Sequence, residues 1–227
     1  MKLITVVGIR KSGKTSTVTA LLAEIRRREL TVGSCKSVFC PTFSIDKPGS
    51  NTAKHMQAGS APVCSRAKHE TAFIYPAQLP LSRILRLYGD CDYVLLEGDY
   101  LAPVPRLVAA HSKADALPRT NDLTLAYVGR ISTKKEEALS LPCFDPLTQA
   151  AQLLDFIDAH VPETTVTPAL DIPLPPVPGV TDDGFCQCGC HHHEKQMSAV
   201  QVTVGGRTIR LSPEQEAQVL SWAEEQG

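Results

Sequence analysis

The chain has 227 residues, of which 43% are hydrophobic and 21% are charged, a composition typical of soluble globular domains. Its 23 Lys and Arg residues balance 24 Asp and Glu residues, so the net charge of -1 argues against a broad basic surface. No run reaches 18 apolar residues, and the N-terminus lacks the pattern of an export signal. We therefore expect a cytoplasmic protein that binds neither nucleic acid nor membrane.

Strands and helices alternate along residues 1–162. A β-branched run at 2–7 ends at a glycine, and residues 12–28 have helical periodicity, so the chain begins with strand, glycine loop and helix. The same patterns predict strands at 30–38, 62–66, 73–75, 93–96, 106–110 and 123–128, and helices at 53–58, 79–88 and 148–159. This alternation predicts an α/β domain with a mostly parallel sheet and helices on both faces.

The first loop matches a phosphate-binding motif. Gly8 to Thr15 fit G-x-x-x-x-G-K-[ST] between a predicted strand and a predicted helix, the context that the motif requires. In such a loop, backbone N–H groups face phosphate oxygens, the lysine reaches the β and γ phosphates, and the hydroxyl ligates Mg²⁺. The motif predicts a site for a nucleoside triphosphate at Gly8, Arg10, Lys11, Ser12, Gly13, Lys14, Thr15 and Ser16.

A bound magnesium ion also requires a carboxylate near the loop. The apolar strand at 93–96 is followed by Glu97, our candidate for holding Mg²⁺ with Thr15 or for orienting an attacking water. The alternative is that Glu97 only caps a surface loop, because Asp92 and Asp99 lie close by in sequence. No Asn-Lys-x-Asp stretch follows a later strand, so the residues do not distinguish GTP from ATP.

Several further short segments of residues 1–162 match the pattern of a known protein family in order and spacing. Besides the phosphate loop, they are Lys36, 43–50 (with Asp46-Lys47-Pro48-Gly49), His55, 58–59, 95–98 and 141–145. Their order and spacing resemble the MobB family of molybdopterin guanine dinucleotide biosynthesis adaptors. The resemblance implies a P-loop NTPase fold and a homodimer that binds GTP with Mg²⁺ and assists the molybdenum cofactor guanylyltransferase or a molybdoenzyme assembly factor. It leaves open whether the chain is an enzyme, and a slow GTPase activity is the expectation.

The chain also departs from the family pattern. A His-Asp-rich stretch usual after the lysine is replaced here by Ser37-Val-Phe-Cys40, and Asn51 stands where an aspartate is common. This loss of carboxylates makes Asp46 and Glu97 the remaining candidates for catalytic acids or bases. The alternative for Asp46 is a plain turn, in which the following Pro and Gly serve geometry alone.

Composition changes sharply after residue 162. We interpret 163–180 as a Pro-rich linker and 181–227 as a small module with a Cys/His loop, a β-hairpin around Gly205-Gly206 and a helix opening at Ser212-Pro213. The five cysteines before the module are expected to be free thiols. Within the module, three thiols and one imidazole are candidate ligands for Zn²⁺ or Ni²⁺: Cys186, Cys188, Cys190 and His191. The alternative is a loop that binds no metal.

Two other functions fit parts of this sequence. A metal-inserting GTPase would use the Cys/His cluster together with the phosphate loop. A small-molecule kinase would use Glu97 or Asp46 as the base that accepts a hydroxyl proton. The kinase is the weaker alternative, because no arginine cluster resembling a kinase phosphate clamp follows the loop.

Overall fold

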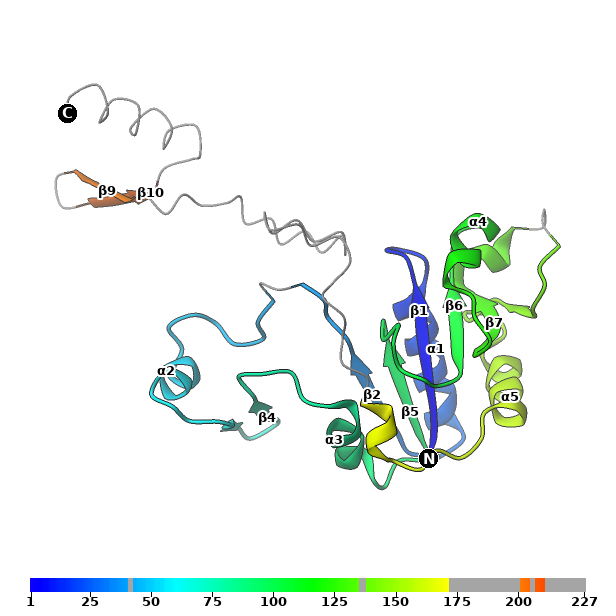
Figure 1. Cartoon of the computed structure of the whole chain (residues 1–227), viewed down its shortest axis with the longest axis horizontal. Helices are drawn as coiled ribbons and strands as arrows, with labels where there is room; N and C mark the ends of the chain where they lie inside the picture. The colour runs from blue at the N-terminus through cyan, green and yellow to red at the C-terminus, as the bar shows by residue number, and fades with distance from the viewer. Residues whose placement is uncertain (41–42, 135–137, 172–200, 205–206, 211–227) are drawn as a thin grey trace.

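The structure is a computed structural model that describes residues 1–40, 43–134 and 138–171, together with the backbone of 201–204 and 207–210. Within these residues, a six-stranded sheet has the order β2-β5-β1-β6-β7-β8, and every neighbouring pair is parallel (Figure 1). Its strands are β1 (Lys2–Gly8), β2 (Val32–Lys36), β5 (Tyr93–Glu97), β6 (Arg106–Ala109), β7 (Thr124–Val128) and β8 (Cys143–Phe144). The predicted α/β class is confirmed.

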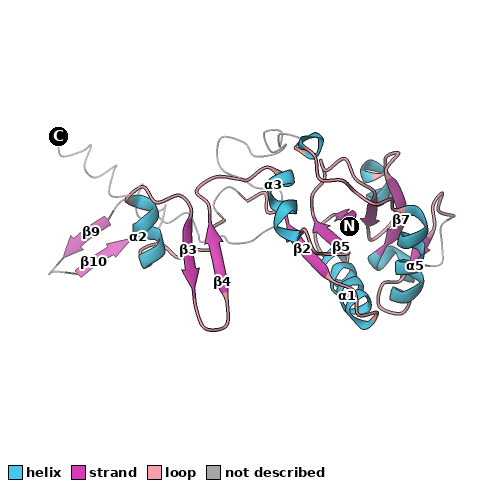
Figure 2. Cartoon of the chain, turned by 90° about the horizontal axis from the view of Figure 1, so that it is seen from below, coloured by secondary structure: helices cyan, strands magenta, loops and turns pink. Residues whose placement is uncertain are grey.

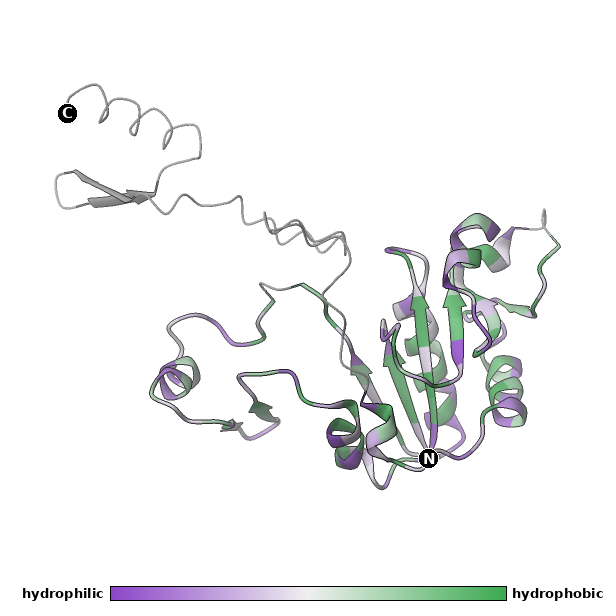
Figure 3. Ribbon diagram, in the orientation of Figure 1, coloured by the Kyte–Doolittle hydropathy of each residue, from purple (hydrophilic) through white to green (hydrophobic). Residues whose placement is uncertain are grey.

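Helices cover both faces of this sheet. On one face, α1 (Lys14–Arg27) and α5 (Ala150–His160) pack against alternate strand residues such as Ile4 and Leu95. On the other face, Leu3 and Val94 pack with α3 (Leu81–Leu85), while Val7 packs with α4 (Lys113–Ala116). Because both faces are covered, the central strands are almost continuously hydrophobic (Figure 3), as expected of a parallel sheet. Short 3-10 helices complete these layers at Arg86–Tyr88, Leu117–Arg119, Gly129–Thr133 and Pro168–Leu170.

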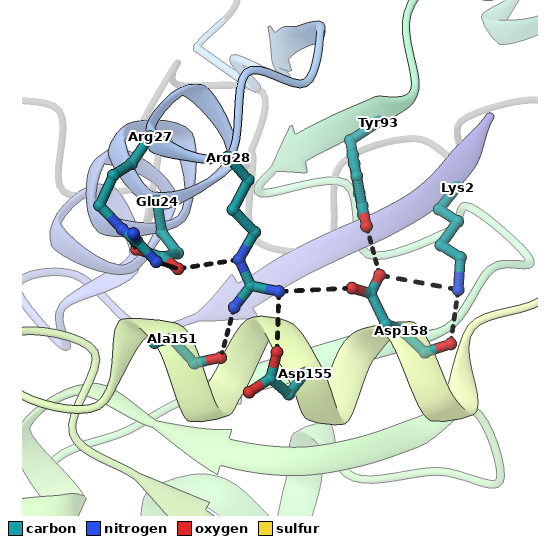
Figure 4. A network of polar contacts seen from close by, with 8 residues as sticks. All are labelled: Lys2, Glu24, Arg27, Arg28, Tyr93, Ala151, Asp155 and Asp158. Carbon is teal, nitrogen blue, oxygen red and sulfur yellow. Dashed lines mark hydrogen bonds and ion pairs between the residues drawn. The ribbon is translucent and has the colours of Figure 1, made fainter.

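A polar network joins α1 to α5 at the end of the sheet away from the glycine loop (Figure 4). Arg28 donates to Glu24, at 2.9 Å, and to the Ala151 carbonyl, at 3.1 Å. It also pairs with Asp155 and Asp158, at 2.7 and 3.7 Å. Hydrogen bonds from Arg27 and then Arg28 lower the pKa of Glu24 to about 2. Arg28 therefore adds polar contacts between two helices that also share a hydrophobic core.

We predict that Arg28→Ala lowers the free energy of unfolding by about 1 kcal/mol at neutral pH, as expected for a partly buried charge network. The matched control is Arg26→Ala, because exposed Arg26 bonds only to the Leu30 carbonyl among the described residues. Since the pKa of Glu24 is lowered on folding, its contribution exists above pH of about 4.5 and is lost as the pH falls toward about 2. The difference between wild type and Arg28→Ala in urea unfolding should therefore shrink over that range, and a constant difference would contradict this account.

Residues 43–80 form an arm that extends to one side of the sheet (Figure 2). The arm contains α2 (Asn51–Gln57) and an antiparallel hairpin of β3 (Val63–Arg66) and β4 (Thr71–Ile74). The strands predicted at 62–66 and 73–75 thus exist, but they form their own hairpin instead of joining the parallel sheet. The arm has little core of its own, because α2 buries no residue while Ile45 and Phe73 are 81% and 62% exposed.

Other differences from the predicted elements are short. The first helix begins at Lys14 because residues 8–13 form the loop, and α4 and β8 were not predicted because four and two residues are too short for a periodic pattern. The predicted domain boundary at 162 falls before a segment that packs on the sheet. Thr164 donates to the Met1 carbonyl, and Leu170 is buried beside Leu3.

β9 (Gln201–Val204) and β10 (Arg207–Arg210) pair antiparallel at the positions of the predicted C-terminal hairpin, while the predicted module as a whole stays a prediction. Residues 172–180 of the predicted linker and the Cys/His loop lie outside the described residues. Of the five earlier cysteines, Cys35, Cys64, Cys91 and Cys143 are free thiols, as predicted. None of the helices in the described ranges is long and apolar enough to cross a lipid bilayer.

Candidate nucleotide-binding site

The loop between β1 and α1 lies at the carboxyl edge of the parallel sheet (Figure 1). Its backbone curls through positive φ angles at Gly8, Lys11 and Gly13, of 152°, 59° and 108°. Gly13 precedes the first helical residue, and no side chain caps the N-terminus of α1. The first N–H groups of α1 therefore lack a side-chain partner there, and this helix end favours an anion.

The lysine of the loop folds back over it. Lys14 Nζ donates to the carbonyl oxygens of Gly8 and Ile9, at 2.9 and 2.7 Å. Burial lowers the pKa of Lys14, the Glu97 charge opposes this, and the positive charges of Lys36 and Arg119 add to the lowering. The ammonium thus lies over the loop, bonded to two neutral carbonyls of the same loop.

A carboxylate faces the hydroxyl that follows this lysine. Glu97, at the end of β5, is 8% exposed and accepts a hydrogen bond of 2.8 Å from the Thr15 hydroxyl. The same carboxylate oxygen pairs with Lys36 Nζ, at 3.2 Å, from the end of the adjacent strand β2. The structure therefore brings together the predicted pair of oxygen donors, Thr15 and Glu97, which is the donor type that Mg²⁺ prefers.

Two residues that the sequence did not indicate brace the loop. Gly129, directly after β7, packs so closely on Gly13 that a Cβ on Gly13 would lie 3.0 Å from the Gly129 Cα. The Gly8 N–H donates to the Tyr100 hydroxyl at 3.1 Å, and that hydroxyl donates back to the Gly8 carbonyl. A glycine just after a buried strand was a usable signal for Gly129, whereas nothing local in the sequence marks Tyr100.

A pocket of about 1120 Å³ opens above the loop, large enough for a nucleotide. Its walls come from the loop, the ends of β2, β5 and β7, and the segment that follows β8. Among the described residues, two acidic side chains line it, Glu97 and Asp145, against six basic ones: Arg10, Lys11, Lys14, Lys36, Arg119 and Arg130. This local excess of positive charge contrasts with the net charge of -1 of the whole chain and favours a polyanionic ligand.

Most of the predicted binding residues line this pocket. They are Gly8, Arg10, Lys11, Gly13, Lys14, Thr15, Ser16 and Glu97. Ser12 is buried instead, and its hydroxyl donates to the Ile9 carbonyl at 2.8 Å, so it shapes the loop from behind.

The second predicted acid, Asp46, lies in the arm and does not line the pocket. Its carboxylate accepts from the Ser50 hydroxyl at 2.8 Å and from the Lys47 N–H at 2.9 Å. Ser50 in turn caps α2 by accepting from the Ala53 N–H. Hydrogen bonds from Ser50 and then Thr52 lower the pKa of Asp46. In this structure Asp46 orders the turn that begins α2.

The predicted metal ligands divide between two regions. Thr15 and Glu97 meet at the phosphate loop, as described. The cluster of Cys186, Cys188, Cys190 and His191 lies outside the described residues. Within the described ranges, no three His, Cys, Asp or Glu side chains gather as a metal-binding group.

The parallel sheet, the glycine loop at its carboxyl edge and the Thr15–Glu97 pair define a P-loop NTPase fold. The model of one protein family, described as molybdopterin guanine dinucleotide synthesis protein B (MobB), matches residues 3–129, more than half of the chain. The chain therefore belongs to the MobB family.

Solved structures agree with this fold. MobB from Bacillus subtilis superposes with a TM-score of 0.55 at 22% identity, covering 69% of this chain and 98% of that one. A MobB homologue from Bacillus stearothermophilus gives a TM-score of 0.54 at 20% identity, covering 70% and 100%. No curated protein matches the sequence. At these identities the structures show the fold, and the family model carries the assignment.

Proposed function

We propose that this chain binds GTP with Mg²⁺ and hydrolyses it slowly, as an adaptor in the assembly of molybdopterin guanine dinucleotide. The observation that carries the proposal is the phosphate loop with Lys14 at its mouth and the Thr15–Glu97 pair beside it, in a pocket with a strong excess of basic residues. This arrangement suits a triphosphate and its metal ion.

Thr15 and Glu97 would hold the magnesium ion, the hydroxyl directly and the carboxylate directly or through water. When bound, Mg²⁺ would neutralise charge on the β and γ phosphates. Lys36 would then lose part of its attraction to Glu97, from which it is 3.2 Å away, and its ammonium would be available to phosphate. Lys14 would exchange two carbonyl partners for phosphate oxygens.

Guanine as the base, and the adaptor role, rest on the family of molybdopterin guanine dinucleotide synthesis proteins to which the chain belongs. A guanylyltransferase that attaches GMP to molybdopterin, or a molybdoenzyme assembly factor, is the proposed partner. The chain would present nucleotide to this partner or dock to it.

We also propose that the chain is a homodimer. The arm buries little of its apolar surface within one chain, since Phe43, Ile45 and Phe73 are exposed. The strand β2 is an edge of the sheet, where among the described residues the Ser34 carbonyl accepts from the Tyr88 hydroxyl at 2.7 Å, and an edge strand is a surface on which another chain can pair. A second copy that covers the arm would remove this apolar surface from water.

Glu97→Gln should reduce Mg²⁺-dependent GTP turnover by at least tenfold, because it removes a charge from the metal side of the pocket. Asp46→Asn is the comparison, and it should change turnover by less than about twofold, since its carboxylate serves the start of α2. Phosphate release under saturating GTP measures both variants. A larger loss of turnover in Asp46→Asn than in Glu97→Gln would mean that Asp46, and not Glu97, is the carboxylate that supports hydrolysis.

Native mass spectrometry of the untagged full chain tests the remaining parts of the proposal together. We expect two chains and one GTP with Mg²⁺ per chain.

We further propose one Zn²⁺ at Cys186, Cys188, Cys190 and His191, which would be absent after serine replacement of the three cysteines. Nucleotide-dependent binding of Ni²⁺ at that cluster would instead favour the metal-inserting GTPase, because linkage between two sites is reciprocal.

A further inference from the structure

One arginine outside the phosphate loop faces the same pocket. Arg119 ends the short 3-10 helix Leu117–Arg119, which directly follows α4. Figure 1 shows α4 above the carboxyl ends of β6 and β7, at the edge of the sheet where the loop after β1 lies. The start of this segment contacts the loop, because His111 Nε2 lies 3.2 Å from the Arg10 carbonyl. Arg119 is half-buried and lines the pocket.

The guanidinium of Arg119 has few hydrogen-bond partners among the described residues. Among the described residues it makes one hydrogen bond, from Nη1 to the Asp115 carbonyl at 2.9 Å, although a guanidinium carries five N–H donors. No described carboxylate lies within ion-pair distance of it. By contrast, Arg28 at the α1–α5 junction pairs with three carboxylates. A half-buried arginine with free donors in a basic pocket favours an anionic ligand.

The charge of Arg119 also acts at the reactive end of the loop. It is one of the positive charges that lower the pKa of Lys14, after burial and the charge of Lys36. Lys36 lines the pocket from the end of β2, and Arg119 lines it from the segment between β6 and β7. An anion in the pocket that Lys14, Lys36 and Arg119 line would be stabilised by all three positive charges.

Resting on the proposed triphosphate site, we propose that Arg119 contacts the terminal phosphoryl group of the bound nucleotide. Its fork of donors suits two phosphoryl oxygens, a geometry that Lys14 cannot supply. The chain thus carries in cis an arginine that distinguishes a nucleoside triphosphate from a diphosphate. The diphosphate would retain the contacts of the loop backbone and Lys14 but lose that of Arg119.

The test is calorimetry of the full chain with Mg²⁺, using the non-hydrolysable β,γ-imido analogue of GTP and, separately, GDP. Arg119→Ala should weaken the affinity for the analogue by about tenfold or more, which is the loss typical of a hydrogen bond to a charged group. Its affinity for GDP should fall by less than about twofold. The affinity of Arg119→Lys for the analogue should lie between those of wild type and Arg119→Ala, since lysine keeps the charge but lacks the fork of N–H donors.

The matched control is Lys113→Ala. Lys113 lies on α4, its Nζ donates to the Ala138 carbonyl at 2.9 Å, and it does not line the pocket. The substitution removes one positive charge from the same segment. Because Lys113 does not line the pocket, Lys113→Ala should leave the affinities for the analogue and for GDP at their wild-type values. An equal loss in Lys113→Ala would mean that only long-range charge is measured, which would overturn the contact.

Three results separate the possible failures. Unchanged affinity of Arg119→Ala for the analogue, or an equal loss for analogue and GDP, would overturn the role of Arg119 while the triphosphate site stands. Absence of nucleotide binding by the wild type would overturn the proposed function itself, and this inference with it. Should Arg119→Ala fail to fold, Arg119→Lys decides, because a wild-type ratio of the two affinities would contradict the proposal.

Discussion

Lys14→Ala should lose at least about 100-fold in affinity for GTP, equivalent to about 3 kcal/mol, because the variant lacks the ammonium that would contact two phosphates. The fold should remain, since in the described structure Lys14 Nζ bonds only to the Gly8 and Ile9 carbonyls of its own loop. Titration with a fluorescent GTP analogue measures the affinity, and thermal unfolding checks that the variant is folded.

The control for this variant is Lys54→Ala. Lys54 lies on α2 in the arm and does not line the pocket, so removal of its charge should leave nucleotide affinity unchanged. A folded Lys14→Ala variant that binds GTP as tightly as wild type would mean that the loop is a structural turn and that the ligand site lies elsewhere.

Gly129→Ala should strongly destabilise the chain. Gly129 has φ of 81°, and a Cβ there would lie 2.2 Å from the Ser12 carbonyl oxygen. That carbonyl accepts the Arg130 N–H at 3.0 Å, so the clash cannot be relieved without moving the phosphate loop or breaking this bond. We expect a loss of about 3 kcal/mol in the free energy of unfolding, together with weaker nucleotide binding.

A matched glycine separates the clash from the backbone strain. Gly49 has nearly the same φ, 82°, but a Cβ there would meet nothing within 4 Å. Gly49→Ala should therefore cost only the strain of a left-handed residue, about 1 kcal/mol, and leave nucleotide affinity intact. Urea unfolding of both variants gives the difference, and equal losses would show that the close contact between Gly129 and the loop has no energetic weight.

The parts of the site that follow from local pattern were predictable from sequence. Strand, glycine loop and helix are encoded by adjacent residues, so the motif at 8–15 located the loop and implied its chemistry. Glu97 was found because an apolar run ending in a carboxylate marks the end of a buried strand. The same reasoning placed the sheet in the α/β class, which the structure confirms.

The contacts that the loop and its pocket make with distant parts of the chain were not predictable in this way. Tyr100 and Gly129 contact the loop and Arg119 lines its pocket because β5, β6 and β7 lie beside or near β1, and strand order is not written in any one segment. A glycine after a buried strand marked Gly129 locally, but not its contact with Gly13. The arm shows the same limit. Alternation revealed its strands, but nothing in 62–66 or 73–75 specified that they pair with each other and not with the main sheet.

The central claim, that the pocket above residues 8–15 is a GTP site, is tested most directly by calorimetric titration of the wild-type chain with GTP and with ATP in Mg²⁺. We expect saturable binding of one GTP per chain, with an affinity for ATP at least about tenfold weaker. Absence of saturable binding by the folded chain, or ATP affinity equal to or tighter than that of GTP, would contradict this claim.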